Sequence, residues 1–138
     1  MKQIDELIRG ELSAVKSIDA ILGKVKNNSE KDQLYSIRQD HVQAVDKLRP
    51  FAGTSFSEGA VETGGPWGAF AKAFIGGASF FGDKAALKAL KVGEEHGVNE
   101  YREAMKSKEL DQNVKRLIET DLLPKQEMHL RTINNYLQ

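Results

Sequence analysis

Two carboxylates and two imidazoles interrupt the hydrophobic stripes of four predicted helices. They are Glu11, His41, Glu94 and His129. An ionisable side chain among leucines and isoleucines loses the hydration that stabilises its charge, so these groups must neutralise, bond one another or share a cation. Because Zn²⁺, Mn²⁺ and Fe²⁺ all accept mixed nitrogen and oxygen ligands, the four residues could hold one divalent transition metal ion. The polar residues predicted to surround them are Gln126, Glu95 and Tyr101.

The same four side chains could instead form a polar layer without any ion. In that interpretation each histidine neutralises a glutamate, and the hydrogen bonds fix the register of the helices. Both interpretations require the four side chains to point inward at one shared depth. A metal ion would have to be held by histidine and carboxylate alone, because the chain contains no cysteine.

The composition and motifs of the chain argue against several other classes of function. Lys plus Arg and Asp plus Glu both number 20, so the net charge is +0 and no overall field attracts nucleic acid. No apolar run approaches the ~20 residues of a membrane span, and the N-terminus has no signal-peptide pattern, so we expect a cytoplasmic protein. No catalytic triad, phosphate loop or dinucleotide motif is present, which favours a non-enzymatic role.

Four helices must position these side chains, and the hydrophobic spacing predicts them within a single domain spanning residues 1–138. The predicted helices cover about residues 2–26, 29–49, 83–106 and 110–137. Ser29 is the predicted N-cap of the second helix, and the short turns near residues 27 and 108 predict two antiparallel hairpins. The glycine-rich stretch 53–82 is long enough to run the length of the bundle and is predicted to contain a short helix. This pattern predicts an all-α, ferritin-like four-helix bundle.

The register of the second hairpin is harder to reconcile with a shared site. A fold about residue 108 places Glu94 ~4.5 Å along the axis from Gln126 and ~9 Å from His129. Contact would need long side chains or a register adjustment. Pro124 cannot donate to the carbonyl group of Thr120, so we expect the last helix to kink there.

The connector carries more apolar surface than a solvated linker needs. We expect this surface to pack on the bundle, and the alternative is a homo-oligomer or partner interface. The residues concerned are Trp67, Phe70, Phe74 and Phe81.

Two resemblances bear on these predictions. From residue 53 onward, segments such as Gly82-Asp83-Lys84-Ala85-Ala86-Leu87 and Leu122-Leu123-Pro124-Lys125-Gln126 resemble a bacterial family of ferritin-like four-helix bundles, a domain of unknown function with no assigned activity. Di-iron ferritin-like proteins use two glutamates and two Glu-x-x-His motifs. Here Arg38 and Gln126 stand where the motif glutamates would be, so the chain lacks both motif carboxylates and we do not expect ferritin-type iron oxidation.

Two functions follow from these observations. The first is a non-enzymatic oligomerising or partner-binding module whose core contains a polar Glu/His layer. The alternative is a mononuclear metal-binding protein that holds Fe, Mn or Zn in that layer.

Overall fold

The fold is described for residues 2–53 and 83–138 of a computed structural model, and every element within these ranges is helical. The first hairpin consists of α1 and α2, and the second consists of α4 and a long final helix in three parts. The elements are α1 (Lys2–Leu22), α2 (Asn28–Leu48), the 3₁₀ turn η1 (Arg49–Phe51), α4 (Asp83–Lys106), α5 (Gln112–Leu117), η3 (Ile118–Leu122) and α6 (Leu123–Leu137).

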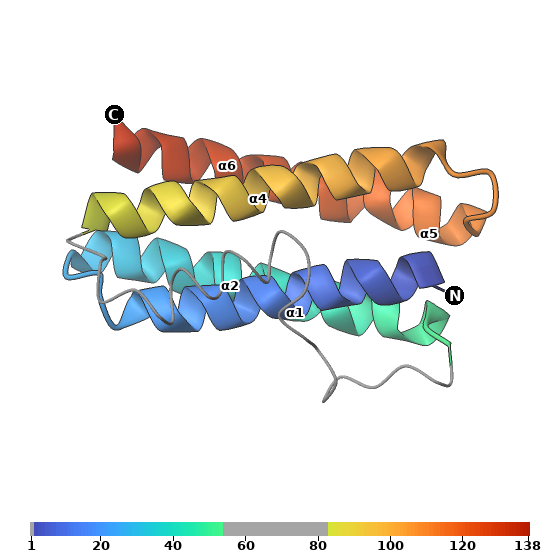
Figure 1. Cartoon of the computed structure of the whole chain (residues 1–138), viewed down its shortest axis with the longest axis horizontal. Coiled ribbons are helices and arrows are strands. Elements are labelled where there is room, and N and C mark those ends of the chain that lie inside the picture. The colour runs from blue at the N-terminus through green and yellow to red at the C-terminus, as the bar shows by residue number, and fades with distance from the viewer. Residues whose placement is uncertain (1, 54–82) are drawn as a thin grey trace.

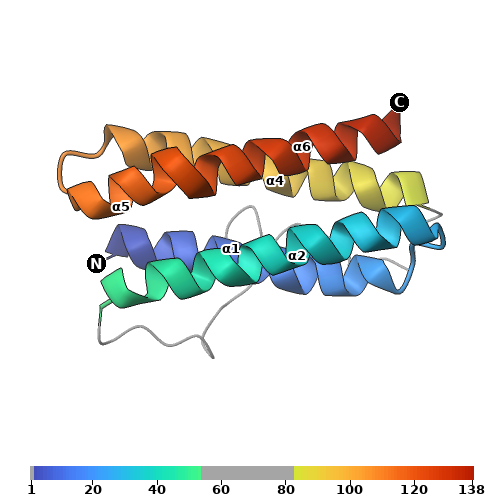
Figure 2. The ribbon, with the colours of Figure 1, turned by 180° about the vertical axis from the view of Figure 1, so that it is seen from behind.

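The helices lie side by side along one long axis (Figures 1 and 2). α1 and α2 run antiparallel, as do α4 and the final helix, whereas α2 and α4 run in the same direction (Figure 1). Within each hairpin the two helices pack closely, and the hairpins meet through α1 against α4 and α2 against α6. The predicted all-α class and the two antiparallel hairpins are confirmed.

Two hydrophobic clusters fill the core, one at each end of the bundle. One cluster includes Ile18, Leu34 and Leu90, and the other includes Ile8, Leu48 and Ile118. Each of the four long helices contributes to both clusters. Between the clusters along the helices lie the buried residues Glu11, His41, Glu94, Gln126 and His129, so this polar layer interrupts the core near its middle.

The first turn differs in detail from the prediction. α1 ends at Leu22, not near residue 26, and α2 begins at Asn28. The cap is Asn27 and not Ser29, because the Asn27 side chain accepts a hydrogen bond of 3.0 Å from the Glu30 backbone N–H. Asn and Ser are both favoured at the N-cap, so the residue type did not distinguish the two positions, and the predicted cap is two residues too late.

A π-helical turn, η3, comes directly before Pro124, where the kink was predicted. The backbone N–H of Leu123 donates to the carbonyl group of Ile118, five residues earlier, where an α-helix would use the fourth. Proline cannot donate to the helix ladder, which makes the wider turn less costly there. The extra residue moves Gln126 and His129 back along the axis by about one residue rise, ~1.5 Å.

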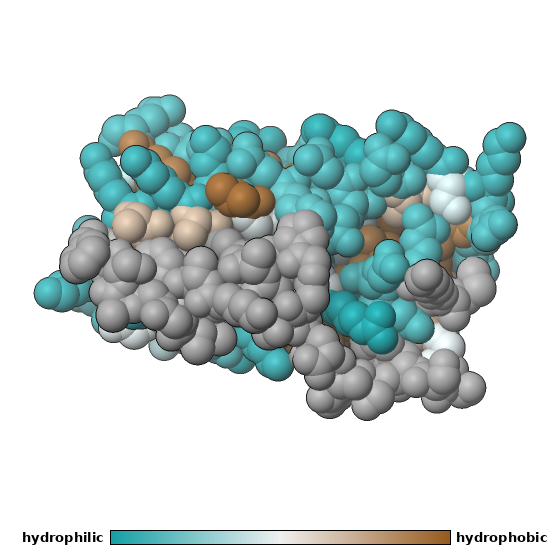
Figure 3. All heavy atoms as spheres, viewed as in Figure 1, coloured by the Kyte–Doolittle hydropathy of each residue, from teal (hydrophilic) through white to brown (hydrophobic). Residues whose placement is uncertain are grey.

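The space-filling view shows mostly hydrophilic residues where the described helices form the surface, with hydrophobic residues in small groups (Figure 3). None of the helices in residues 2–53 and 83–138 combines the length and apolar character of a membrane span. The predictions for the connector, including Trp67, Phe70, Phe74 and Phe81, lie outside the described residues.

Candidate metal centre

The four predicted ligands point inward from four different helices. Glu11 comes from α1, His41 from α2, Glu94 from α4 and His129 from α6. Their exposed fractions are 5%, 1%, 0% and 4%, respectively, so none of them meets bulk water. Hydrophobic residues flank each of them on its own helix, which is why the helices bury them together with the core.

His41 lies between two buried carboxylates. Its Nδ1 atom is 2.6 Å from Glu11 Oε2, and its Nε2 atom is 2.7 Å from Glu94 Oε1. An ionised carboxylate only accepts hydrogen bonds, so both ring nitrogens of His41 donate and the ring is an imidazolium in this arrangement. His41 thereby joins the first hairpin to the second.

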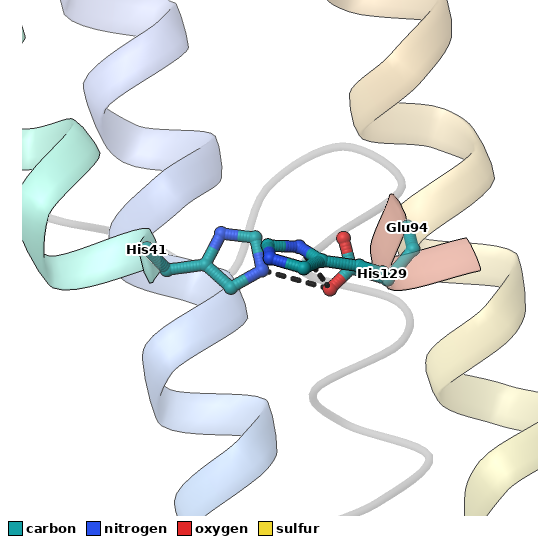
Figure 4. A group of neighbouring side chains, drawn as sticks. All are labelled: His41, Glu94 and His129. Carbon is teal, nitrogen blue, oxygen red and sulfur yellow. Dashed lines mark hydrogen bonds and ion pairs between the residues drawn. The ribbon is translucent and has the colours of Figure 1, made fainter. Parts of the chain in front are cut away.

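His129 has one satisfied ring nitrogen and one that lacks a hydrogen-bond partner. Its Nε2 atom is 2.9 Å from Asp40 Oδ2, a neighbour of His41 on α2. Its buried Nδ1 atom is directed at Glu94 Oε1 from 3.6 Å, which is too long for a hydrogen bond. Both imidazoles thus present one nitrogen to the same carboxylate, as Figure 4 shows, with ring centres 4.9 Å apart.

Two further residues hold the glutamates in place. The Tyr101 hydroxyl donates to Glu11 Oε1 over 2.5 Å, and the Gln126 amide donates to Glu94 Oε2. Gly97 makes room for that amide, since a Cβ atom at this position would lie 2.5 Å from Gln126 Nε2. Glu94 therefore keeps Oε1 for the two histidines while Oε2 is occupied.

The charges in the layer shift the pKa values of its members. Burial opposes the charge on His41, but Glu94 and Glu11 outweigh it and raise the pKa of His41 well above its usual value. Burial likewise opposes ionisation of Glu94, yet His41 and His129 lower its pKa to about 2. For His129, burial is outweighed by Asp40 and Glu94, which raise its pKa. Burial and Glu11 raise the pKa of Tyr101, so the phenol stays protonated and donates.

The histidines and Glu94 form a group of potential metal ligands. One atom from each of His41, Glu94 and His129 lies within 4.8 Å of the other two. Four-coordinate ions with ligand bonds of ~2.1 Å separate neighbouring ligand atoms by about 3.4 Å. The distance of 3.6 Å from His129 Nδ1 to Glu94 Oε1 fits this spacing. The distance of 2.7 Å from His41 Nε2 to Glu94 Oε1 would have to lengthen to the same spacing when an ion binds.

The predicted ligand Glu11 has a different place in the cluster. It contacts His41 at Nδ1, the nitrogen that faces away from Glu94, so it orients a ligand rather than joining the other three. Asp40 does the same for His129, and the sequence analysis missed it. Carboxylates that bind the second ring nitrogen of a histidine are common around metal ions because they fix the tautomer and the ring orientation.

Two predictions for the surroundings change. Glu95 is exposed on α4 and takes no part in the layer, because one step along a helix turns a side chain by ~100°. Arg38 turns outward, where its guanidinium bonds Asp19 with Nε 2.6 Å from Oδ1, so it does not repel a cation in the core. The other two residues expected in the surroundings, Tyr101 and Gln126, bond Glu11 and Glu94, respectively.

No family model, curated protein or solved structure matches this chain.

Proposed function

We propose that this protein binds one divalent transition metal ion in the middle of its helical bundle. His41 Nε2, His129 Nδ1 and Glu94 Oε1 would be its ligands. Glu11 and Asp40 would orient the two imidazoles, and water or a further ligand would complete the coordination. Two imidazoles and one carboxylate suit Zn²⁺ and Fe²⁺.

The observation that carries this proposal is the Nδ1 atom of His129. Buried polar atoms without a hydrogen bond are rare and call for an explanation. Asp40 accepts a hydrogen bond from Nε2–H, so Nδ1 is the ring nitrogen without a partner, and it lies 3.6 Å from Glu94 Oε1, beyond hydrogen-bond distance. A metal ion that replaces the Nδ1 proton and binds both atoms would give each of them a partner.

Charge balance also supports the proposal. Glu11, Glu94 and Asp40 bring three negative charges, and two imidazolium rings leave a net charge of −1 in the absence of metal. A divalent ion held by two neutral imidazoles leaves the same net charge. The ion would therefore replace two protons without adding charge to a buried site, where charge is costly.

The course of the chain supports a relationship to ferritin-like bundles. In that fold, one long connection links two antiparallel hairpins. The parallel α2 and α4 are consistent with this topology (Figure 1). The missing motif carboxylates at Arg38 and Gln126 favour one ion over two, because a pair of adjacent ions needs bridging carboxylates to offset its charge.

A second candidate function is a partner-binding or oligomerising module with an ion-free polar layer. The direct contact of 2.7 Å between His41 and Glu94 favours it, because an ion would have to separate these groups. In that case the layer would fix helix register, and the histidines would bind no metal.

Titration of the metal-free protein with Co²⁺, in buffer from which trace metals have been removed, distinguishes the two functions when it is followed by elemental analysis. We expect one Co²⁺ per chain and visible absorption bands typical of nitrogen and oxygen ligation. His129→Gln and Glu94→Gln should abolish the bands. His96→Gln is the matched control, since His96 lies at the surface beside Glu100 and should leave them unchanged.

Substoichiometric metal after supplementation with Fe²⁺, Zn²⁺ and Co²⁺ would reject the metal function and leave the polar layer. Equal loss of binding in His96→Gln would show that the metal binds elsewhere.

A further inference from the structure

Glu94 offers a metal ion one of its two carboxylate oxygens. Its Oε2 atom accepts a hydrogen bond from the Gln126 side-chain amide, and the same amide nitrogen is 3.4 Å from the backbone carbonyl oxygen of Glu94. Its Oε1 atom faces the two histidines, with His41 Nε2 at 2.7 Å and His129 Nδ1 at 3.6 Å. A carboxylate held in this way binds an ion through Oε1 alone.

The surroundings of Gln126 keep its amide in place. The residue is 2% exposed, so water does not compete for the amide hydrogens. Gly97 leaves the space that the amide occupies, since a Cβ atom there would lie 2.5 Å from Gln126 Nε2. Moving the amide away would leave a buried donor and a buried carboxylate oxygen without partners, which is costly.

The second buried glutamate is already occupied. Both oxygens of Glu11 accept hydrogen bonds, Oε1 from Tyr101 and Oε2 from His41. Within the part of the chain that the structure describes, the group that could hold an ion therefore has three donor atoms, one each from His41, Glu94 and His129.

Three protein donors in a buried layer suit an ion that needs few ligands. Zn²⁺ is satisfied by four ligands in a tetrahedron, so one water molecule would complete its coordination. Mn²⁺ prefers six ligands, mostly oxygen atoms, and would need several water molecules around side chains that are at most 4% exposed. A second oxygen from Glu94 would reduce that need, but the Gln126 amide occupies it.

We propose that Gln126 makes the metal centre selective for Zn²⁺ over Mn²⁺ by limiting Glu94 to one ligand oxygen. This inference rests on the proposed metal function. Sites built from nitrogen and oxygen ligands generally bind Zn²⁺ more tightly than Mn²⁺. The contribution of Gln126 is therefore the part of that preference that disappears when its amide is removed.

The ratio of the Mn²⁺ Kd to the Zn²⁺ Kd measures this contribution. Free Mn²⁺ is counted by its electron paramagnetic resonance signal, and Zn²⁺ affinity is measured by competition with a chelator. We expect Gln126→Glu to lower the ratio by about tenfold or more, because it removes the amide and adds a ligand oxygen. Gln43→Glu is the matched control at an exposed position of α2 and should leave the ratio unchanged.

Gln126→Leu separates the loss of the amide from the gain of a charge. Leucine removes the donor and adds no carboxylate, so we expect the ratio to fall in the same direction by a smaller factor. The ratio compares two ions on one protein, so a general loss of stability does not change it. A fall in Gln126→Glu alone would assign the effect to the added charge and overturn the proposed role of the amide.

The unmodified protein provides a test that needs no variant. With Zn²⁺ bound, we expect the Gln126 side-chain amide to stay protected from exchange with solvent, because Glu94 Oε2 still accepts its hydrogen bond. NMR of the isotope-labelled protein follows this amide with and without Zn²⁺. Loss of protection on Zn²⁺ binding would show that both oxygens of Glu94 bind the ion, which would overturn the inference.

The outcomes separate this inference from the proposed function. If neither ion binds, the metal function is rejected, and the selectivity is rejected with it. If Zn²⁺ binds stoichiometrically but both Gln126 variants keep the ratio of the unmodified protein, the metal function stands and Gln126 does not determine its selectivity.

Discussion

His41 is the residue on which the polar layer depends, because each of its ring nitrogens bonds a different buried carboxylate. His41→Leu would leave Glu11 and Glu94 without their partner in the core. Breaking a buried ion pair by removing one partner costs about 3–5 kcal/mol, so we expect a loss of this size in the free energy of unfolding. Urea denaturation of the metal-free protein measures it.

Two further variants identify the cause of that loss. His96→Leu removes a surface histidine and should change stability by less than about 0.5 kcal/mol. Adding Glu94→Gln to His41→Leu should recover part of the loss, because it removes one of the stranded charges. Additive effects of the two substitutions would contradict the pairing.

The pH dependence of the metal-free protein follows from the same pair. The pKa of Glu94 is lowered from 4.5 to about 2, so its contribution is present above pH 4.5 and is lost as the pH falls toward 2. The pKa of His41 is raised above 6.5, so its contribution is complete below pH 6.5 and is lost as the pH rises through the folded value. The pair should contribute most between these limits.

We therefore expect the stability difference between the unmodified protein and His41→Leu to peak in mildly acidic solution. It should fall on the acid side as Glu94 is protonated, and fall again on the alkaline side as His41 loses its proton. Urea denaturation with chelator present, from about pH 3 to about pH 9, provides the curve. A difference that does not change with pH would show that the layer carries no charge pair.

At the residue scale, the sequence was sufficient to find the inward side chains but not all of their partners. Glu11, His41, Glu94 and His129 could be predicted because each interrupts a hydrophobic stripe. Asp40 could not, since its side chain remains 29% exposed and its position falls outside the stripe. The distinction between a ligand and an orienting carboxylate depends on which ring nitrogen each carboxylate meets, and spacing along a helix does not contain that information.

At the scale of elements, the spacing of buried residues along the last helix accounts for its π-helical turn. The buried residues Val114, Ile118, Leu122 and Gln126 follow one another in three steps of four. In an α-helix of 3.6 residues per turn, three such steps rotate the last residue by about 120° away from the first. The extra residue of η3 absorbs about 100° of this rotation, so both halves of the last helix face the core. Pro124 predicted a kink, while the steps of four indicated the wider turn.

Contact between α4 and α6 depends on Gly97, and Gly97→Ala tests it. Alanine should favour a helix by about 1 kcal/mol, but its Cβ atom would lie 2.5 Å from Gln126 Nε2. We expect the displaced amide to leave Glu94 Oε2 unsatisfied and to produce a net loss of about 1–2 kcal/mol in the free energy of unfolding. The measurement is urea denaturation.

Gly23→Ala is the control for that substitution. Nothing lies within 4 Å of a Cβ atom at Gly23, so alanine there should leave stability unchanged or raise it by up to about 1 kcal/mol. If both variants are equally stabilised, Gly97 does not hold the amide of Gln126 in place.

At the scale of the whole molecule, the polar layer joins two hairpins that otherwise meet mainly through hydrophobic contact. His41 belongs to the first hairpin, and Glu94 and His129 belong to the second. Helices within a hairpin pack more closely than helices of different hairpins. An ion bound by these residues would fasten the hairpins together halfway between the two hydrophobic clusters, so its binding energy would act on the cooperative unfolding of the bundle.

We therefore expect metal to raise the unfolding temperature of the whole bundle in one transition. A ligand that binds only the folded state adds about 2.7 kcal/mol at a free concentration of 100 times its Kd, which corresponds to roughly 10 °C for a domain of this size. Circular dichroism at 222 nm with and without Zn²⁺ follows the helices, and near-ultraviolet dichroism follows the packing around Tyr101. The two signals should shift together. In His129→Gln neither should shift, because the second hairpin then keeps only one ligand, and a shift that persists in this variant would place the stabilising ion outside the layer.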